Sequence, residues 1–298
     1  MIEAQPSQTA FLTAVHRAWH HHMAPEPKVL NDDLALKLSG LQSLAEAEVY
    51  VNTIIENFTA LSDPETASTF VQHIEASVCM RSRVVEEQLL LARKRNIQQL
   101  VILGAGLDST TYRRKDLTEG LKVIEIDHPS TQRWKHECLA KANINVPENV
   151  NFVAFDFENQ TLAQAMEQGG VDFNLMTFFT WLGVQMYLTD DAVKSTFSVM
   201  GRFPAGSELI MDFISPAYTD NTDIAADSVA QLSEVVSQMG EPILSKYYES
   251  ELEDRLNEAG FAKVDFLSAG LLKDRYLGGG SAAYQIPDEA TYLLSATI

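Results

Sequence analysis

A glycine turn between two apolar runs constrains the fold of this chain more than any other feature. The first run, residues 100–103, stops at Gly104-Ala105-Gly106, and the second ends at Asp127, 23 residues after Gly104. This is the spacing of a strand, a tight turn, a helix and a second strand whose terminal carboxylate reaches the ribose hydroxyls of a bound nucleoside. The stretch therefore predicts an α/β unit that binds a nucleoside.

The pattern after residue 100 extends this unit. Short apolar runs alternate with helical stretches, which is typical of βαβ units and of a mostly parallel sheet covered by helices on both faces. We expect seven strands, at 100–103, 121–126, 150–154, 173–178, 207–214, 261–267 and 290–298, and helices at 109–115, 129–142, 161–168, 190–200 and 250–259.

The first hundred residues have helical apolar spacing. Helices are predicted near 7–23, 31–39 and 41–61, and Asp63-Pro64-Glu65 has the form of an N-cap, a first-turn proline and a first-turn acid that open a fourth helix. We therefore expect an N-terminal helical cap over 1–62 and a domain over 63–298 that contains the sheet. The polar segment at about 215–248 interrupts the alternation and is predicted to be a lid-like insertion over the carboxyl edge of the sheet.

Charge and composition exclude several classes of partner. The 298 residues include 22 basic and 41 acidic ones, a net charge of −19, which repels phosphate backbones and anionic bilayers, so no nucleic acid and no membrane is expected as a partner. Cys79 and Cys138 have no metal-ligand spacing and are expected to be free thiols. We find neither a secretory signal pattern nor an apolar run of about 18 residues. The expectation is a cytoplasmic protein with a small-molecule partner, and the sequence carries no sign of its oligomeric state.

Ser109 narrows the choice of nucleotide. A dinucleotide site needs G-x-G-x-x-G, and Ser109 occupies the position of the third glycine. This disfavours an NAD-dependent oxidoreductase, which stays as the alternative enzyme. S-adenosylmethionine has no pyrophosphate, and its methionine carboxylate would face the N–H groups of the turn. Asp127 has a second interpretation as a solvated strand-end acid or helix cap, and Asp108 is expected to cap the helix after the turn.

Arg81 is a charged residue on an otherwise apolar helix face. It occupies the missing position of a stripe that steps by three or four residues, whereas Arg83 points roughly the other way; the stripe consists of Ala67, Val71, Ile74, Val78, Val85 and Leu89. A guanidinium on a buried face needs an anion. Arg81 therefore either clamps a ligand carboxylate or forms an internal salt bridge with an acid.

At this point the chain resembles the leucine carboxyl methyltransferase-like family of class I S-adenosylmethionine-dependent methyltransferases, in particular its bacterial branch of O-methyltransferases. The resemblance covers nearly the whole chain. It rests on motifs that occur in the family's order: Ser7-Gln8-Thr9-Ala10, Arg81-Ser82-Arg83, residues 101–109 around the glycine turn, Glu125-Ile126-Asp127-His128-Pro129, Phe155-Asp156-Phe157, Trp181-Leu182-Gly183-Val184 and Tyr187-Leu188-Thr189.

The resemblance implies the Rossmann-like class I methyltransferase fold and a role for each matched position. Arg81 and the turn Gly104-Ala105-Gly106 would hold the methionine end of S-adenosyl-L-methionine, and Asp127 the ribose. Asp156 and Phe157 would flank the adenine. The chain departs from the family in two places: some relatives have an acid where Leu182 stands, and many bacterial relatives have an arginine at the position of Thr110.

The expected activity is a methyl transfer to an oxygen atom of a small molecule, either a carboxylate or a hydroxyl. A carboxylate needs no base, whereas a hydroxyl must lose a proton. His128 and Tyr187 are the candidate proton acceptors, with alternative interpretations as a helix-start residue and a packing residue. A non-catalytic relative that binds the nucleoside is the alternative outside enzymes.

Two residue clusters have a structural interpretation that we prefer over a functional one. His16 shares a helix face with His20 in the run His20-His21-His22, yet no acid or cysteine is spaced to complete a metal site, so no metal is expected. Trp181 and the pair Phe178-Phe179 end a predicted strand, where aromatic residues belong more often to the core than to a methyl-transfer site.

Overall fold

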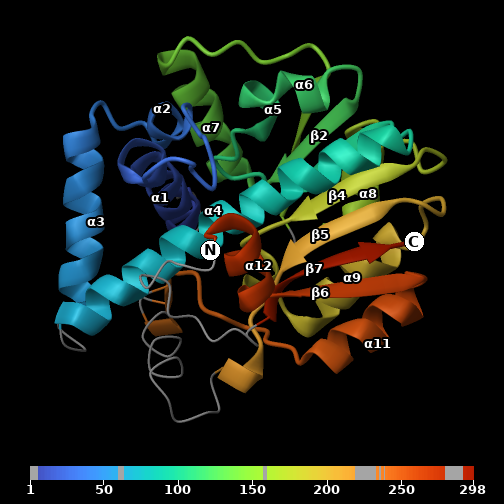
Figure 1. The fold of residues 1–298 in the computed structure, drawn as a ribbon. Helices are drawn as coiled ribbons and strands as arrows, with labels where there is room; N and C mark the ends of the chain where they lie inside the picture. The colour runs from blue at the N-terminus through green and yellow to red at the C-terminus, as the bar shows by residue number, and fades with distance from the viewer. Residues whose placement is uncertain are drawn as a thin grey trace.

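In the computed structural model, the described residues are 6–59, 64–156, 160–218, 233–234, 236–237, 239–278 and 291–298. Within them, seven strands form one sheet in the order β3-β2-β1-β4-β5-β7-β6 (Figure 1). The strands are β1 Gln99–Leu103, β2 Lys122–Asp127, β3 Val150–Ala154, β4 Thr177–Trp181, β5 Glu208–Asp212, β6 Lys263–Ser268 and β7 Thr291–Thr297. Neighbouring strands from β3 to β5 are parallel, and β7 is antiparallel to both β5 and β6. The predicted class I methyltransferase-like sheet is confirmed.

Every residue of β1, β4 and β5 is buried, because helices cover both faces of the sheet. On one face lie α8 Leu162–Gln168, α9 Asp190–Met200 and α11 Glu249–Ala259. On the other lie α4 Pro64–Lys94, α6 Lys115–Thr118 and α12 Ala269–Tyr276. The remaining elements are α5 Thr110–Arg113, α7 Pro129–Lys141 and the 3-10 turns η1 Gln185–Tyr187 and η2 Pro216–Tyr218.

The N-terminal helices are α1 Gln8–Met23, α2 Ala35–Ser39 and α3 Leu44–Thr59, and they stand beyond the carboxyl ends of the parallel strands (Figure 1). They share a small core with the first turns of α4, built from Val15, Ala47, Val51, Ala67 and Val71. Further along, α4 packs on the sheet through Val84 and Leu89. The long helix α4 therefore joins the N-terminal helices to the sheet, and α1 lies next to the glycine turn at the end of β1.

The structure corrects the predicted strand at 173–178. The strand β4 begins only at Thr177, because Asp172 accepts a hydrogen bond of 2.9 Å from the Asn174 N–H and turns the chain there. Phe173 packs on Phe203 with ring centroids 4.7 Å apart instead of entering the sheet. An apolar run alone does not separate a buried loop aromatic from a strand residue.

The helical regions also differ from the prediction in detail. The predicted helix at 109–115 is two short helices, α5 and α6, and α12 follows β6 where the apolar pattern indicates no element. The predicted N-cap Asp63 lies outside the described residues, and α4 begins at Pro64. Among the described residues, no helix combines the length and apolarity needed to cross a bilayer.

Candidate functional site

The glycine turn after β1 has a backbone that only glycine adopts easily. Gly104 has φ +64° and Gly106 has φ +45°, a region in which a side chain costs about 1–2 kcal/mol. The N–H groups of Gly104 and Ala105 donate to the Ile126 carbonyl at 2.8 and 3.1 Å, which fixes the turn to the end of β2. A Cβ on Gly104 would overlap Cγ2 of Val184, and one on Gly106 would lie 3.2 Å from the Cβ of Ala10 in α1.

Asp127, the last residue of β2, faces this turn. Its carboxylate accepts hydrogen bonds from the Gly106 N–H and, at 2.6 Å, from the His128 N–H. Burial raises the pKa of Asp127 to about 6, and the two backbone donors limit the rise. The residue is 8% exposed, so it is not a solvated strand-end acid. It is not the helix cap either, because His128 caps α7.

His128 has the structural role that its position suggests. Its Nδ1 lies 2.7 Å from the Ser130 hydroxyl and accepts the Ser130 N–H at the start of α7. Asp108 is similar: its carboxylate accepts the Thr110 N–H at 2.8 Å, at the start of α5. Both side chains thus serve helix starts beside the turn.

Arg81 forms an ion pair with Asp212 at the carboxyl end of β5. Asp212 also accepts the Gly183 N–H at 2.7 Å, and a Cβ on Gly183 would lie 3.1 Å from the guanidinium of Arg81. The internal salt bridge, one of the two interpretations of Arg81, is therefore present. Arg83 points away, as predicted, and pairs with Glu87 at 2.8 Å. Because Val184 follows Gly183 and covers Gly104, the ion pair lies close to the glycine turn.

Tyr187, at the end of η1, lies where three segments meet. It is hydrogen bonded to the side chain of Thr9 in α1. The Thr9 N–H in turn donates at 3.2 Å to the buried carboxylate of Glu241, from the segment 239–248. Burial, with the charge of Glu241, raises the pKa of Tyr187 far above its usual value. Tyr187 therefore keeps its proton at neutral pH and is a hydrogen-bond donor.

The segment 239–248, at the end of the predicted insertion, is attached to η1. The N–H groups of Leu244 and Ser245 donate to the Met186 carbonyl at 2.8 and 3.2 Å, and the Gln185 amide donates to the Ser245 hydroxyl at 2.6 Å. No motif in the sequence pointed to Glu241, because its contact with Thr9 spans 232 positions and only the tertiary structure creates it.

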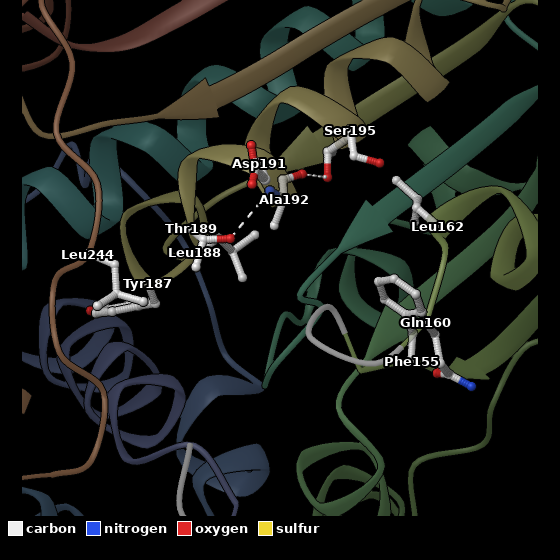
Figure 2. Close-up of a pocket in the computed structure, with 11 residues that line it drawn as sticks. Phe155, Gln160, Leu162, Tyr187, Leu188, Thr189, Asp191, Ala192, Ser195 and Leu244 are labelled. Atoms are coloured by element: carbon white, nitrogen blue, oxygen red, sulfur yellow. Dashed lines mark hydrogen bonds between the residues drawn. The ribbon is translucent and has the colours of Figure 1, made fainter.

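A pocket of about 380 Å³ extends from Tyr187 to the end of β3. Figure 2 shows Tyr187 and Leu244 at one end, and Phe155 and Gln160 at the other. Asp156, next to Phe155, forms two 3.0 Å hydrogen bonds with Gln160: its N–H donates to the Gln160 side chain, and its carbonyl accepts the Gln160 N–H. Phe157 lies outside the described residues. Phe155, the neighbour of the predicted adenine-binding residue Asp156, therefore lines the same cavity as Tyr187.

Ser109, which replaces the third glycine, is part of a buried ionic network. Its hydroxyl donates to Asp32 at 2.7 Å, and Asp32 also binds Arg17 at 2.9 Å and Arg113 at 3.5 Å. Burial alone would raise the pKa of Asp32, but the two arginines hold it below its usual value. Arg17 further donates to the Leu107 carbonyl at 2.6 Å. The network ties α1 to the glycine turn, so serine has a structural function at this position.

The remaining candidate side chains lie in the core or away from the carboxyl edge of the sheet. Phe178, Phe179 and Trp181 are fully buried between the sheet and its helices. His20 pairs with Glu75 at 3.0 Å. In the part of the chain that the structure describes, no three metal-binding side chains come together, and both cysteines are free and buried.

The sequence model of the family described as leucine carboxyl methyltransferase matches residues 10–201 of this chain. The chain belongs to the leucine carboxyl methyltransferase family. A Bacillus subtilis relative named "Putative S-adenosyl-L-methionine-dependent methyltransferase YktD" is 29% identical over 93% of both chains. A relative of the same description from Mycobacterium marinum is 27% identical over 76% of this chain and 72% of its own.

Solved structures agree on the fold of this leucine carboxyl methyltransferase family member. A DUF574 family protein from Streptomyces avermitilis superposes with a TM-score of 0.58 at 16% identity, covering 100% of this chain and 99% of its own. A structure described as a "putative methyltransferase", from Thermobifida fusca, gives a TM-score of 0.58 at 14% identity, covering 99% of this chain and 96% of its own.

The family and the sequence relatives together show that the chain is an S-adenosylmethionine-dependent methyltransferase, and they do not support the alternative of an NAD-dependent oxidoreductase.

The residues at the turn fit the cofactor of this family. Gly104 and Gly106 are partly exposed and have positive φ, so the turn between them presents backbone rather than side chains. The Asp127 carboxylate has about four acceptor positions, of which the described backbone donors use two, so it has capacity for ribose hydroxyls.

Proposed function

We propose that the protein transfers the methyl group of S-adenosylmethionine to an oxygen atom of a small molecule, a carboxylate or a hydroxyl. The observation that carries the cofactor half is the positive-φ glycine turn held against the buried Asp127 carboxylate. The contact of Thr9, Tyr187 and Glu241 supports a small acceptor, because it brings α1 and the segment 239–248 together over η1. The proposed cytoplasmic location rests on the sequence.

Each predicted binding residue has a task in this proposal. Asp127 accepts the ribose hydroxyls, the turn 104–106 lies under the methionine tail, and Arg81 faces the methionine carboxylate. Asp156 and Phe157 flank the adenine. The cofactor supplies a methyl group activated by the positive charge of its sulfur. The protein's contribution is to align the acceptor oxygen with that methyl group and to exclude water.

Of the two acceptor classes, we propose the carboxylate. Tyr187 keeps its proton, so it donates a hydrogen bond to an acceptor oxygen and does not remove a proton from a hydroxyl. His128 is engaged with Ser130 at the start of α7. A carboxylate acceptor needs neither of them as a base.

The acceptor class can be read from the product. The protein is incubated with S-adenosylmethionine carrying a radioactive methyl group and an extract of small metabolites, and the products are treated with mild alkali. Methyl esters release volatile methanol, whereas methyl ethers are stable, so we expect volatile radioactivity. Alkali-stable product would contradict a carboxylate acceptor. No transfer despite tight cofactor binding would favour the non-catalytic alternative.

Asp127→Ala tests the cofactor site. We expect calorimetry to show that S-adenosylhomocysteine binds less tightly by about 1–3 kcal/mol, because a charged hydrogen-bond acceptor is lost. Asp116→Ala is the matched control, since Asp116 is an exposed acid on α6 that pairs with Arg114. An unchanged affinity in Asp127→Ala would remove Asp127 from the site, and no binding to the wild-type protein would contradict the cofactor assignment.

The raised pKa of Asp127 predicts a pH dependence of binding. Ribose hydroxyls bind best to the ionised carboxylate, so affinity should fall as the pH is lowered through about 6, where Asp127 takes up a proton. The groups that face it are the N–H groups of Gly106 and His128 and the charges of Lys135 and Glu125. Asp127→Asn should remove this component of the pH profile. An identical profile in wild type and Asp127→Asn would contradict the prediction.

A further inference from the structure

Asp212 and Arg81 form a buried pair of opposite charges at the carboxyl edge of the sheet. Arg81 comes from α4 and Asp212 from the end of β5, and their side chains are 14% and 6% exposed. Gly183, from the end of β4, donates its N–H to Asp212 and lies against the guanidinium. Three elements thus meet beside Val184, the residue that covers Gly104 of the glycine turn.

The pair carries no net charge, which changes what ligand it suits. An arginine without a partner would suit a lone anion, but here an acid already neutralises it. The methionine end of the cofactor is an α-amino acid with one carboxylate and one ammonium. A charged group at such a site needs an opposite charge, because burial without one is costly. The ion pair presents one partner for each group.

Both members retain hydrogen-bonding capacity. A guanidinium has five N–H donors, and Asp212 is the only hydrogen-bond partner of Arg81 among the described residues. Each Asp212 oxygen accepts one bond there, Oδ1 from Gly183 and Oδ2 from Arg81, so each has a further acceptor position. The pair can therefore bind a zwitterion without being broken.

Tyr292 on β7 supplies an independent sign of a missing polar group. Its hydroxyl is buried and has no hydrogen-bond partner among the described residues. It lies close enough to the pair that the charges of Arg81 and Asp212 both act on its ionisation. A buried hydroxyl without a partner is unfavourable, and a ligand carboxylate held by Arg81 is a suitable partner for it.

We propose that Arg81 and Asp212 bind the zwitterionic methionine end of the cofactor as a unit, with Arg81 receiving the carboxylate and Asp212 the α-ammonium. This inference rests on the proposed cofactor site and adds Asp212 to it. In this proposal both interpretations of Arg81 hold, because Arg81 keeps its salt bridge with Asp212 while it binds the ligand carboxylate.

Four ligands separate the contributions of the two charges. They are S-adenosylhomocysteine, its analogue without the carboxylate (5′-aminopropylthioadenosine), its analogue without the amino group (5′-carboxypropylthioadenosine), and methylthioadenosine, which has neither. For Asp212→Asn we expect at least about tenfold weaker binding of the two ligands with an ammonium, and a change within about threefold for methylthioadenosine. Because Arg81 then has no neutralising acid, the ligand with only a carboxylate should bind at least as tightly as it does to the wild type. Arg81→Met should instead weaken the two ligands with a carboxylate.

Glu208→Gln is the matched control, because Glu208 is a buried acid at the other end of β5, where it pairs with Arg95. It should leave all four affinities unchanged. An equal loss for all four ligands in Asp212→Asn would show a purely structural role and overturn the proposal. So would a loss selective for ammonium ligands in Glu241→Gln but not in Asp212→Asn.

The wild-type protein gives a test that does not depend on the folding of any variant. If an acid binds the ammonium, S-adenosylhomocysteine must bind more tightly than the analogue without the amino group. Equal affinities would overturn the proposal even if every variant unfolds. Failure of the wild type to bind both S-adenosylhomocysteine and methylthioadenosine would instead contradict the cofactor site itself, so the two failures are distinguishable.

Discussion

Gly104→Ala is expected to lower the free energy of unfolding by about 2–5 kcal/mol and to abolish measurable binding of S-adenosylhomocysteine. A side chain at φ +64° costs about 1–2 kcal/mol. The new Cβ would also overlap Val184, and overpacking of this kind costs about 1–3 kcal/mol. Because Gly104 and Ala105 hold the Ile126 carbonyl next to Asp127, relief of the overlap moves the turn away from the ribose acid.

Urea denaturation and calorimetry measure the two effects, and Gly120→Ala is the matched control. Gly120 has φ +77°, but a Cβ there meets nothing within 4 Å. It should therefore show the backbone cost of about 1–2 kcal/mol without any loss of binding. The double variant Gly104→Ala, Val184→Ala removes both γ-carbons and should recover part of the stability. Equal effects of Gly104→Ala and Gly120→Ala would show that the overlap with Val184 is unimportant.

The parts of the site that the sequence predicts are those built from neighbouring elements. The distance from Gly104 to Asp127 is fixed by one strand, one turn and one helical connection, so a local pattern contains the geometry. The alternation of apolar and helical stretches likewise predicts the parallel sheet, and the structure confirms it.

The parts that the sequence does not predict depend on contacts between distant segments. The helical stripe shows that Arg81 needs an anion, but its partner Asp212 is 131 positions away and is one of 41 acids in the chain. The sequence shows that Ser109 replaces the third glycine of a dinucleotide site. Its hydrogen bond to Asp32, 77 positions away, has no sequence signature. Glu241 is found only after α1, η1 and the segment 239–248 have been placed together.

Lys135→Met is expected to destabilise the protein by about 3–5 kcal/mol, because it leaves a buried carboxylate without its cation. Lys135 on α7 and Glu125 on β2 are each 1% exposed and lie 2.6 Å apart. Glu125 also accepts a 3.1 Å hydrogen bond from the Tyr112 hydroxyl, and the lysine ammonium lies 5.3 Å from the Tyr112 ring. Urea denaturation measures the loss.

Two further variants separate the cost of the unpaired charge from the cost of lost packing. Lys135→Met, Glu125→Gln removes both charges and should recover most of the stability. Lys263→Met is the control, because Lys263 and Asp265 form an exposed pair for which the expected loss is about 1 kcal/mol or less. A double variant no more stable than Lys135→Met would attribute the loss to packing.

The pH dependence of Lys135→Met has a definite sign. Burial already raises the pKa of Glu125 while Lys135 opposes the rise, so removing the lysine raises this pKa further in the folded state. A carboxyl whose pKa is higher in the folded than in the unfolded state stabilises the fold when protonated. The deficit of the variant relative to wild type should therefore shrink as the pH falls toward about 4.5, the ordinary pKa of a glutamate. A deficit that stays constant between about pH 7 and pH 5 would contradict this prediction and would mean that Glu125 leaves the interior in the variant. Glu125 and Asp127 lie on the same face of β2. In that case we expect the variant to lose cofactor affinity as well as stability.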